Sequence, residues 1–152
     1  MRQLATILLL SVLFSSACIK RQSNSGPPEE IVRQFVKLSA EATGVPDKRK
    51  LQDLCSGELK RTFERMHDDA FRLIYVNTKL KIVSIKILDS EQQKDSARVH
   101  YEVTVENPQG TDPTREVNSR EVDLRQTNSG WSIESIRTKG TDRIAFTRGM
   151  IF

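Results

Sequence analysis

The chain has 152 residues, a formal net charge of +4 and a pI of about 9.2. This length allows one domain and excludes a second enzyme domain. Two cysteines and two histidines are too few for a disulfide framework or for a zinc site of the usual kind with several protein ligands. The positive charge is small and dispersed, so it indicates no particular class of partner by itself.

The first 18 residues have the organisation of an export signal. Arg2 precedes an uncharged apolar run over residues 4–14, and small residues occupy positions 15–17 before Cys18. This order is typical of a cleaved signal peptide. The run is also shorter than the roughly 20 residues that span a bilayer as a helix. We therefore expect residues 1–17 to be removed.

The small residues before Cys18 resemble the lipobox of bacterial lipoproteins. In those proteins the Cys thiol receives a diacylglyceryl group and becomes the acylated mature N-terminus, so the resemblance implies lipid attachment at Cys18. Ser15 departs from this pattern, because the usual lipobox has Leu there, and Ser15 and Ala17 also fit an ordinary signal peptidase site. Plain secretion would leave Cys18 and Cys55 free to pair.

The residues after Cys18 predict a tether. Several acyl chains anchor a protein to a membrane effectively permanently. Ile19 stands where the inner-membrane retention signal of enterobacterial lipoproteins has Asp, so the resemblance favours the outer membrane, with the protein facing the periplasm. Segment 18–28 has the composition of a flexible linker, with a reach of roughly 18 Å. Residues 29–152 are then expected to form a single α+β domain.

The first half of this domain has the apolar spacing of helices. The spacing predicts a first helix that starts within residues 27–30 and ends at Gly44, a second over 46–54 and a third from about 56 to 74. The first starts with two prolines and two glutamates, which favour the first turn of a helix.

The second half has the alternating pattern of strands. Four are expected, over 79–88, 97–106, 114–126 and from Trp131 onward. Val117 is in opposite phase to the apolar residues that follow it, which indicates a bulge near Asn118 or Ser119. Helices followed by an antiparallel meander predict an α+β fold, with the N-terminal helices packed on one face of a curved sheet of about four strands.

The order of elements resembles a known superfamily. Its motif here comprises Gly130, Trp131, Ile133 and Ile136, and the resemblance to nuclear transport factor two-like, or cystatin-like, domains covers roughly residues 28–139. In that superfamily the helices and the sheet form a cone that can enclose a pocket, which some members use for catalysis and others for protein contact. The fold alone does not choose between these roles.

Two aromatic residues are candidates to line such a pocket, Tyr101 and Trp131, although both also fit the core. Catalytic members of the superfamily have an Asp, or a His and Asp pair, inside the cone. The inward strand positions assigned from this sequence hold no carboxylate, which counts against catalysis.

Other chemistry-bearing residues are sparse. His67 and Glu64 form a weak pair at helical spacing, His100 lies on the polar face of its strand, and Cys55 has the position of a small buried hydrophobe. We therefore predict no catalytic residue, no metal site and no cofactor.

The basic triplet at 48–50 is isolated and aromatic residues are few, which disfavours a nucleic-acid partner. The sequence predicts a lipid-anchored cell-envelope protein of non-enzymatic binding or scaffold type. Its expected partners are an envelope protein or an anionic envelope polymer, and a homodimer through the outer sheet face is a further possibility. The alternative is a small-molecule binding or lyase/isomerase-like cone enzyme in the periplasm. The role of segment 140–152 stays open.

Overall fold

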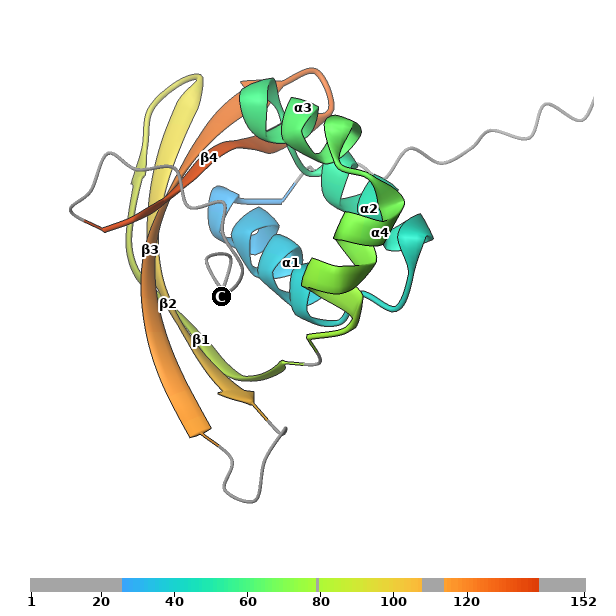
Figure 1. Ribbon diagram of the computed structural model, residues 1–152. Helices are drawn as coiled ribbons and strands as arrows, with labels where there is room; N and C mark the ends of the chain where they lie inside the picture. Colours follow the sequence, from blue (N-terminus) through green and yellow to red (C-terminus); the bar gives the residue numbers. More distant parts are fainter. Residues whose placement is uncertain (1–25, 79, 108–113, 140–152) are drawn as a thin grey trace, which may run out of the picture.

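Helices occupy the first half of the chain and a meander of antiparallel strands the second (Figure 1). The computed structural model describes residues 26–78, 80–107 and 114–139. Within them the elements are α1 (Pro28–Ala40), α2 (Val45–Asp53), α3 (Gly57–Arg65), α4 (Asp68–Phe71), a π-helix η1 (Arg72–Val76), β1 (Lys81–Gln92), β2 (Ser96–Asn107), β3 (Thr114–Thr127) and β4 (Gly130–Thr138). The helices pack against the inner side of a curved sheet with strand order β1-β2-β3-β4. The predicted α+β fold is therefore confirmed.

Helix α1 begins as the sequence indicates and ends earlier. Pro28 opens it, and Glu29 and Glu30 lie in its first turn. It ends at Ala40, one turn before the predicted stop at Gly44. The physical reason lies in the next helix, because the amide of Thr43 donates to the Asp47 carboxylate at 2.9 Å and so turns the chain into α2.

The single helix predicted from residue 56 to 74 is wrong. The chain breaks at Met66, whose ψ of 121° is extended, and helical structure resumes at Asp68. The Met66 carbonyl accepts a hydrogen bond from Lys48 of α2, and the same ammonium pairs with Asp68 at 3.1 Å. The apolar spacing continues across the break because both pieces face the core.

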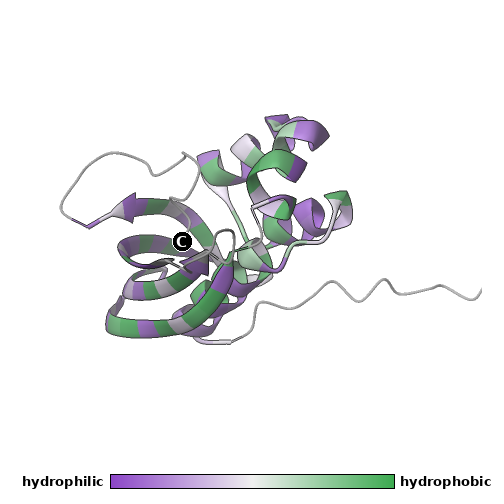
Figure 2. Ribbon diagram, turned by 60° about the horizontal axis from the view of Figure 1, so that its bottom comes forward, coloured by the Kyte–Doolittle hydropathy of each residue, from purple (hydrophilic) through white to green (hydrophobic). Residues whose placement is uncertain are grey.

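The sheet alternates between a buried and a polar side, seen as alternating bands along the strands in Figure 2. The predicted alternation of β2 is confirmed by five buried side chains, which are Ala97, Val99, Tyr101, Val103 and Val105. The bulge predicted near Asn118 is wrong, because β2 and β3 pair in continuous register over their whole length. Val117 is 64% exposed and lies on the other side of the sheet, which explains its phase without a bulge. The irregularity in β3 instead lies between Asp123 and Leu124, opposite β4.

Aromatic rings from the helices fill the space above the sheet. Phe35 of α1 meets Phe63 of α3 edge to face at a centroid distance of 6.2 Å. Tyr75 of η1 lies 5.8 Å from Phe63 and stacks on Phe71 at 4.8 Å. Because edge-to-face and stacked rings add favourable energy to their burial, this cluster joins α1, α3, α4 and η1 into one layer.

The turn between α2 and α3 extends the sheet beyond β4. The amide of Ser56 donates to the Ile133 carbonyl at 2.8 Å, and the amide of Ile133 donates to the Leu54 carbonyl at 2.8 Å. Cys55 and Ile133 thereby form a parallel bridge. This pairing covers part of an edge strand that would otherwise present unpaired backbone groups, and it brings the start of α3 next to the β3–β4 hairpin.

Candidate functional site

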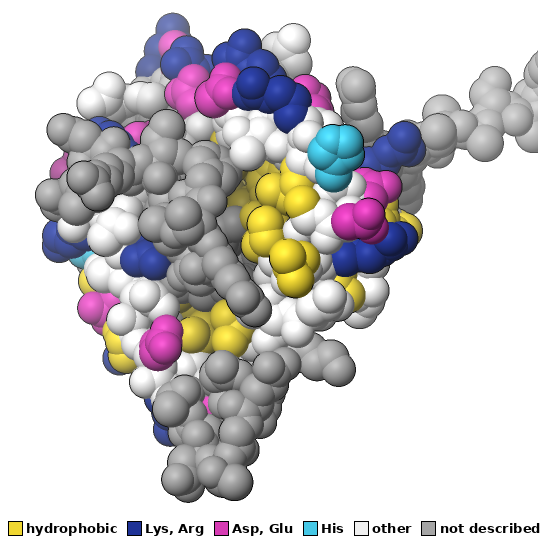
Figure 3. All heavy atoms as spheres, in the orientation of Figure 1, with side chains coloured by type: hydrophobic (Ala, Val, Ile, Leu, Met, Phe, Trp, Pro, Cys, Tyr) yellow, Lys and Arg dark blue, Asp and Glu magenta, His cyan; other side chains and the backbone are white. Residues whose placement is uncertain are grey.

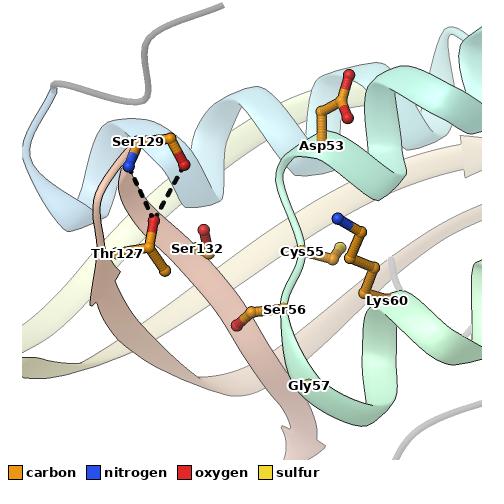
Figure 4. Close-up of a pocket in the computed structure, with 8 residues that line it drawn as sticks. All are labelled: Asp53, Cys55, Ser56, Gly57, Lys60, Thr127, Ser129 and Ser132. Carbon is orange, nitrogen blue, oxygen red and sulfur yellow. Dashed lines mark hydrogen bonds between the residues drawn. The ribbon is translucent and has the colours of Figure 1, made fainter.

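A polar pocket of about 340 Å³ lies between the α2–α3 turn and the β3–β4 hairpin (Figure 4). We call it the hairpin pocket. Its lining residues are Asp53, Cys55, Ser56, Gly57, Lys60, Thr127, Ser129 and Ser132. Four of these carry hydroxyl groups, one carries an ammonium group and one a carboxylate, so the pocket is built for polar contacts.

The hydroxyls at the tip of the hairpin are engaged with one another. Thr127 Oγ1 donates to the Gly130 carbonyl at 2.7 Å and accepts from the Ser129 amide at 3.3 Å. Thr127 Oγ1 also lies 3.0 Å from Ser129 Oγ, as the dashed lines in Figure 4 show. Since the Thr127 hydrogen is used on Gly130, Ser129 donates in that contact. These two hydroxyls fix the shape of the hairpin.

Ser132 and Lys60, unlike Thr127 and Ser129, have no side-chain hydrogen bond or ion pair with the described residues. The Ser132 side chain is only 4% exposed, yet its hydroxyl makes no hydrogen bond to any described residue. Lys60 lies in the first turn of α3 and forms no ion pair with the described part of the chain. The Ser132 hydroxyl therefore opens on the pocket without a partner among the described residues, and it is available to bind a further group there.

The start of α3 contributes backbone donors. Ser56 is the N-cap residue, but its side chain does not cap the helix, and its hydroxyl lies 3.5 Å from the Ile133 carbonyl. The first three amides of a helix have no partner within it, and those of Gly57, Glu58 and Leu59 have no acceptor among the described residues. The N-terminal end of a helix also carries partial positive charge.

Cys55 lies in the wall of this pocket as a buried group. It is 4% exposed, and burial raises the pKa of its thiol far above the usual range, an effect that nearby Lys60 offsets only in part. The neutral thiol is a poor nucleophile. This environment agrees with the small buried hydrophobe expected from the sequence.

The two predicted pocket-lining aromatics lie in the core. Tyr101 is completely buried and Trp131 is 6% exposed, and neither lines the hairpin pocket. Burial raises the pKa of the Tyr101 phenol. A pocket within the cone that these residues line stays a prediction.

The sequence interpretation missed one inward-facing charge, Arg120. It lies opposite Tyr101 in the β2–β3 register and is 6% exposed. Its guanidinium donates to the Ser119 carbonyl at 3.0 Å, and desolvation lowers its pKa. Counting back by two from the buried Val122 would have identified it as an inward position.

The structure does not bring the histidines into a shared site. His67 is exposed at the N-cap of α4, and no group of three metal-ligating side chains occurs in the described ranges. His100 Nε2 lies 2.9 Å from Ser119 Oγ, and His100 Nδ1 lies 3.3 Å from Lys139 Nζ on the outer side of the sheet.

The basic residues of α2 and α3 are largely paired with acidic ones. Lys50 pairs with Asp47 at 2.6 Å, and Arg61 pairs with Glu58 at 3.0 Å, a carboxylate that also contacts Arg65. Figure 3 accordingly shows cationic and anionic side chains intermixed at the end of the molecule where α3 lies. The basic triplet at 48–50 is thus part of a mixed surface.

Cys18 and the predicted tether up to residue 25 lie outside the described residues, as does the C-terminal segment 140–152. Within the described ranges, no helix has the length and apolar character needed to cross a membrane.

Comparison with known proteins identifies the fold and no family. No protein-family model matches the sequence, and no curated protein matches it. The intermembrane space region of the chloroplast protein ARC6 aligns with 72% of this chain and 92% of its own length, with TM-score 0.53 and 14% identity. RPA3114 from Rhodopseudomonas palustris, a protein containing a SEC-C motif, aligns with 73% of this chain and 77% of its own length, with TM-score 0.54 and 13% identity.

The similar structures also include an Ntf2-like protein with a cystatin-like fold from Novosphingobium aromaticivorans. It aligns with 74% of this chain and 80% of its own length, with 12% identity and a TM-score of 0.49, which is too low to assign a fold by itself. At these identities the similarities concern the fold alone.

Proposed function

We propose that this chain is a lipid-anchored cell-envelope protein whose α+β domain acts by binding and not by catalysis. The location is supported by the export signal and by Cys18 behind small residues. The linker composition of residues 18–28, with a reach of roughly 18 Å, would hold the domain close to the membrane surface. Ile19 favours the outer membrane, with the domain in the periplasm.

The composition of the hairpin pocket is the observation that favours binding over catalysis. Nucleophilic catalysis needs a nucleophile beside a base, with a third group to orient that base. Among the lining residues, the Cys55 thiol is held neutral and no histidine is present. The other lining residues offer hydroxyl, ammonium and backbone amide donors in fixed positions, which suits a binding site.

The charged surface supports a partner from the cell envelope. Arg98 pairs with Asp123 at 3.1 Å and Arg137 pairs with Glu121 at 3.1 Å on the outer side of the sheet. A charged partner, such as an envelope protein or an anionic polymer, can pair its own charges with the cationic and anionic side chains of this surface when it binds. A second copy of the chain remains a candidate partner, and sedimentation of the protein tests it.

Two measurements on the full-length chain in a bacterial host test the anchor. The intact mass of the mature protein should correspond to a chain that starts at an acylated Cys18, and the protein should partition into the membrane fraction. Replacing Cys18→Ala should release it into the soluble fraction, whereas Cys55→Ala should leave it membrane-bound. A mature chain that begins at Cys18 without acyl mass would overturn the anchoring proposal.

The binding role is tested by crosslinking the anchored protein in intact cells and identifying what purifies with it. We expect one envelope protein or polymer to be enriched over a control lipoprotein that carries the same N-terminal segment on another domain. Equal recovery with both proteins would contradict a binding function of this domain.

The buried pair of Tyr101 and Arg120 is the observation that favours the alternative, a cone enzyme or small-molecule binder. Such a protein must admit its ligand to the inner face of the sheet. Because Trp131 is the sole tryptophan, its fluorescence reports on that region. A saturable change in its emission with a small ligand that carries a hydrogen-bond acceptor, abolished by Arg120→Met, would favour the alternative over our proposal.

A further inference from the structure

We propose that the hairpin pocket binds a phosphate group, carried either by a small soluble phosphomonoester or by a lipid headgroup. The inference rests on the proposed binding function and specifies its ligand chemistry. It does not depend on where the protein is located in the cell.

The unused hydrogen-bonding capacity of the pocket consists mainly of donors. The hydroxyls of Thr127 and Ser129 are engaged in the hairpin, as described above. What remains is the Ser132 hydroxyl, the Lys60 ammonium and the amide of Gly57, the first residue of α3. An ammonium and an amide can only donate, so the complementary ligand is one that accepts at several points.

Two independent features point to an anion among such acceptors. The first is the N-terminal end of the nine-residue helix α3, which has no side-chain cap and therefore presents amides and partial positive charge. The second is Ser132 on β4, a residue that is only 4% exposed and whose hydroxyl lines the pocket without a partner among the described residues. The two features lie on different elements, α3 and β4. Each offers hydrogen-bond donors that have no acceptor among the described residues.

The charges around the pocket are compatible with an anion. Lys60 supplies a positive charge that no described carboxylate neutralises. Two carboxylates lie close to the start of α3. Glu58 is held by Arg61 and Arg65, and Glu134, which lies next to Gly57, pairs with Arg125 at 3.2 Å, so both negative charges are compensated. Asp53 is the one carboxylate among the lining residues, and Figure 4 shows it on the same side of the pocket as Lys60, opposite Thr127 and Ser129.

The size of the pocket limits the rest of the ligand. A volume of about 340 Å³ is near the lower end of the roughly 300–1,000 Å³ that small-molecule sites occupy. A phosphate with a few additional heavy atoms fits this volume. Phosphate also suits several donors that approach from different directions, because its oxygens can each accept hydrogen bonds.

Calorimetric titration of the full-length protein in detergent tests the proposal with four probes. Inorganic phosphate and glycerol 3-phosphate represent the soluble source. Dihexanoyl phosphatidic acid represents the lipid headgroup, and dihexanoyl phosphatidylcholine controls for its acyl chains. We expect saturable binding of at least one of the first three probes and none of the last. The probe that binds most tightly identifies the source.

The variants Lys60→Met and Ser132→Ala should each weaken this binding by about tenfold or more, as expected for a lost hydrogen bond to a charged group. Their matched controls are Lys86→Met and Ser84→Ala on β1, which do not line the hairpin pocket and should leave affinity unchanged. Because the Ser132 hydroxyl has no partner, Ser132→Ala should also fold with undiminished thermal stability in the absence of ligand.

The outcomes separate this inference from the proposed function. Absence of saturable phosphate binding, or binding that both pocket variants retain, would overturn the phosphate site. Enrichment of an envelope partner in the crosslinking experiment would then still support the binding function. Conversely, phosphate binding that depends on Lys60 and Ser132 would stand even if Cys18 carried no lipid.

Discussion

Cys55 and Ile133 lie side by side in a parallel bridge, although one belongs to a turn between helices and the other to the last strand. The bridge is held by hydrogen bonds on either side of Cys55, from the Ser56 amide to the Ile133 carbonyl and from the Ile133 amide to the Leu54 carbonyl. It places the first turn of α3 against the β3–β4 hairpin. The hairpin pocket exists because of this long-range pairing.

Gly57, immediately after this bridge, should not tolerate a side chain. Its φ of +55° lies in the left-handed region, and an added Cβ would come within 3.4 Å of Glu134 Cγ. We expect Gly57→Ala to lower the free energy of unfolding by about 1–2 kcal/mol, measured by urea denaturation. Gly44→Ala is the control, because Gly44 has an extended φ of −178° and an added Cβ would make ordinary contact with Pro46. Equal losses in the two variants would contradict the conformational explanation.

The aromatic cluster should account for a large part of the stability. Phe63 is completely buried between Phe35 and Tyr75. Phe63→Ala should therefore lower the free energy of unfolding by about 3–5 kcal/mol, through lost burial and the cavity left behind. Leu73→Ala, at a side chain that is 57% exposed, should change it by no more than about 0.5 kcal/mol. Chemical denaturation of both variants measures the difference, and a small effect at Phe63 would argue against this packing.

Asp47 should make stability depend on acidic pH. Hydrogen bonds from Lys50 and from the Thr43 amide lower the pKa of its carboxyl to about 2. Because the folded-state pKa is lower than the unfolded value, the carboxylate stabilises the fold above about pH 4 and this contribution is lost as the pH falls toward 2. We expect Asp47→Asn to lower the free energy of unfolding by about 1–2 kcal/mol at pH 7, a figure reduced for the partial exposure of Lys50.

The pH profile of the Asp47 difference is measured by denaturation of wild type and variant between pH 2 and pH 7. The difference should vanish at the acidic end of this range. Asp69→Asn is the control, because the Asp69 side chain is 95% exposed and its ion pair with Arg72 contributes little. A difference that stays constant with pH would show that the carboxylate charge is not responsible.

Cys55 should be unreactive in the folded protein. Burial raises the pKa of its thiol, so little thiolate forms near neutral pH and reagent access is blocked. Mass spectrometry after iodoacetamide treatment of the Cys18→Ser chain should show alkylation only in denaturant. The added variant Ser129→Cys, at an exposed hairpin position, should react readily without denaturant. Rapid labelling of Cys55 in the native state would contradict its buried environment.

The local pattern of the sequence was sufficient for the architecture. Alternation along residues 97–106 reflects which side chains face the core, and the structure confirms that each apolar residue of this run is buried. The turn at 128–130 likewise leads from β3 into β4, as Asn, Ser and Gly residues favour. Both features depend on residues that are close in sequence, so they can be predicted from the order of residues.

Features that depend on distant residues were not predictable in this way. The apolar spacing continues through Met66 without interruption. The helix nevertheless ends there, where the Lys48 ammonium donates a hydrogen bond to the Met66 carbonyl. Arg120 is a second example. Its burial depends on its position opposite Tyr101 in the β2–β3 register, which involves a distant part of the chain.

The sequence by itself therefore determined the α+β class and most of the buried face of the sheet, and it is the basis for expecting a lipid at Cys18. The tertiary structure alone decided where the helices break and which polar groups converge in the hairpin pocket. The physical reason is that amphipathic periodicity records each residue's relation to the core. Backbone pairing between Ser56 and Ile133, by contrast, leaves no periodic trace, because every residue carries the same amide and carbonyl groups.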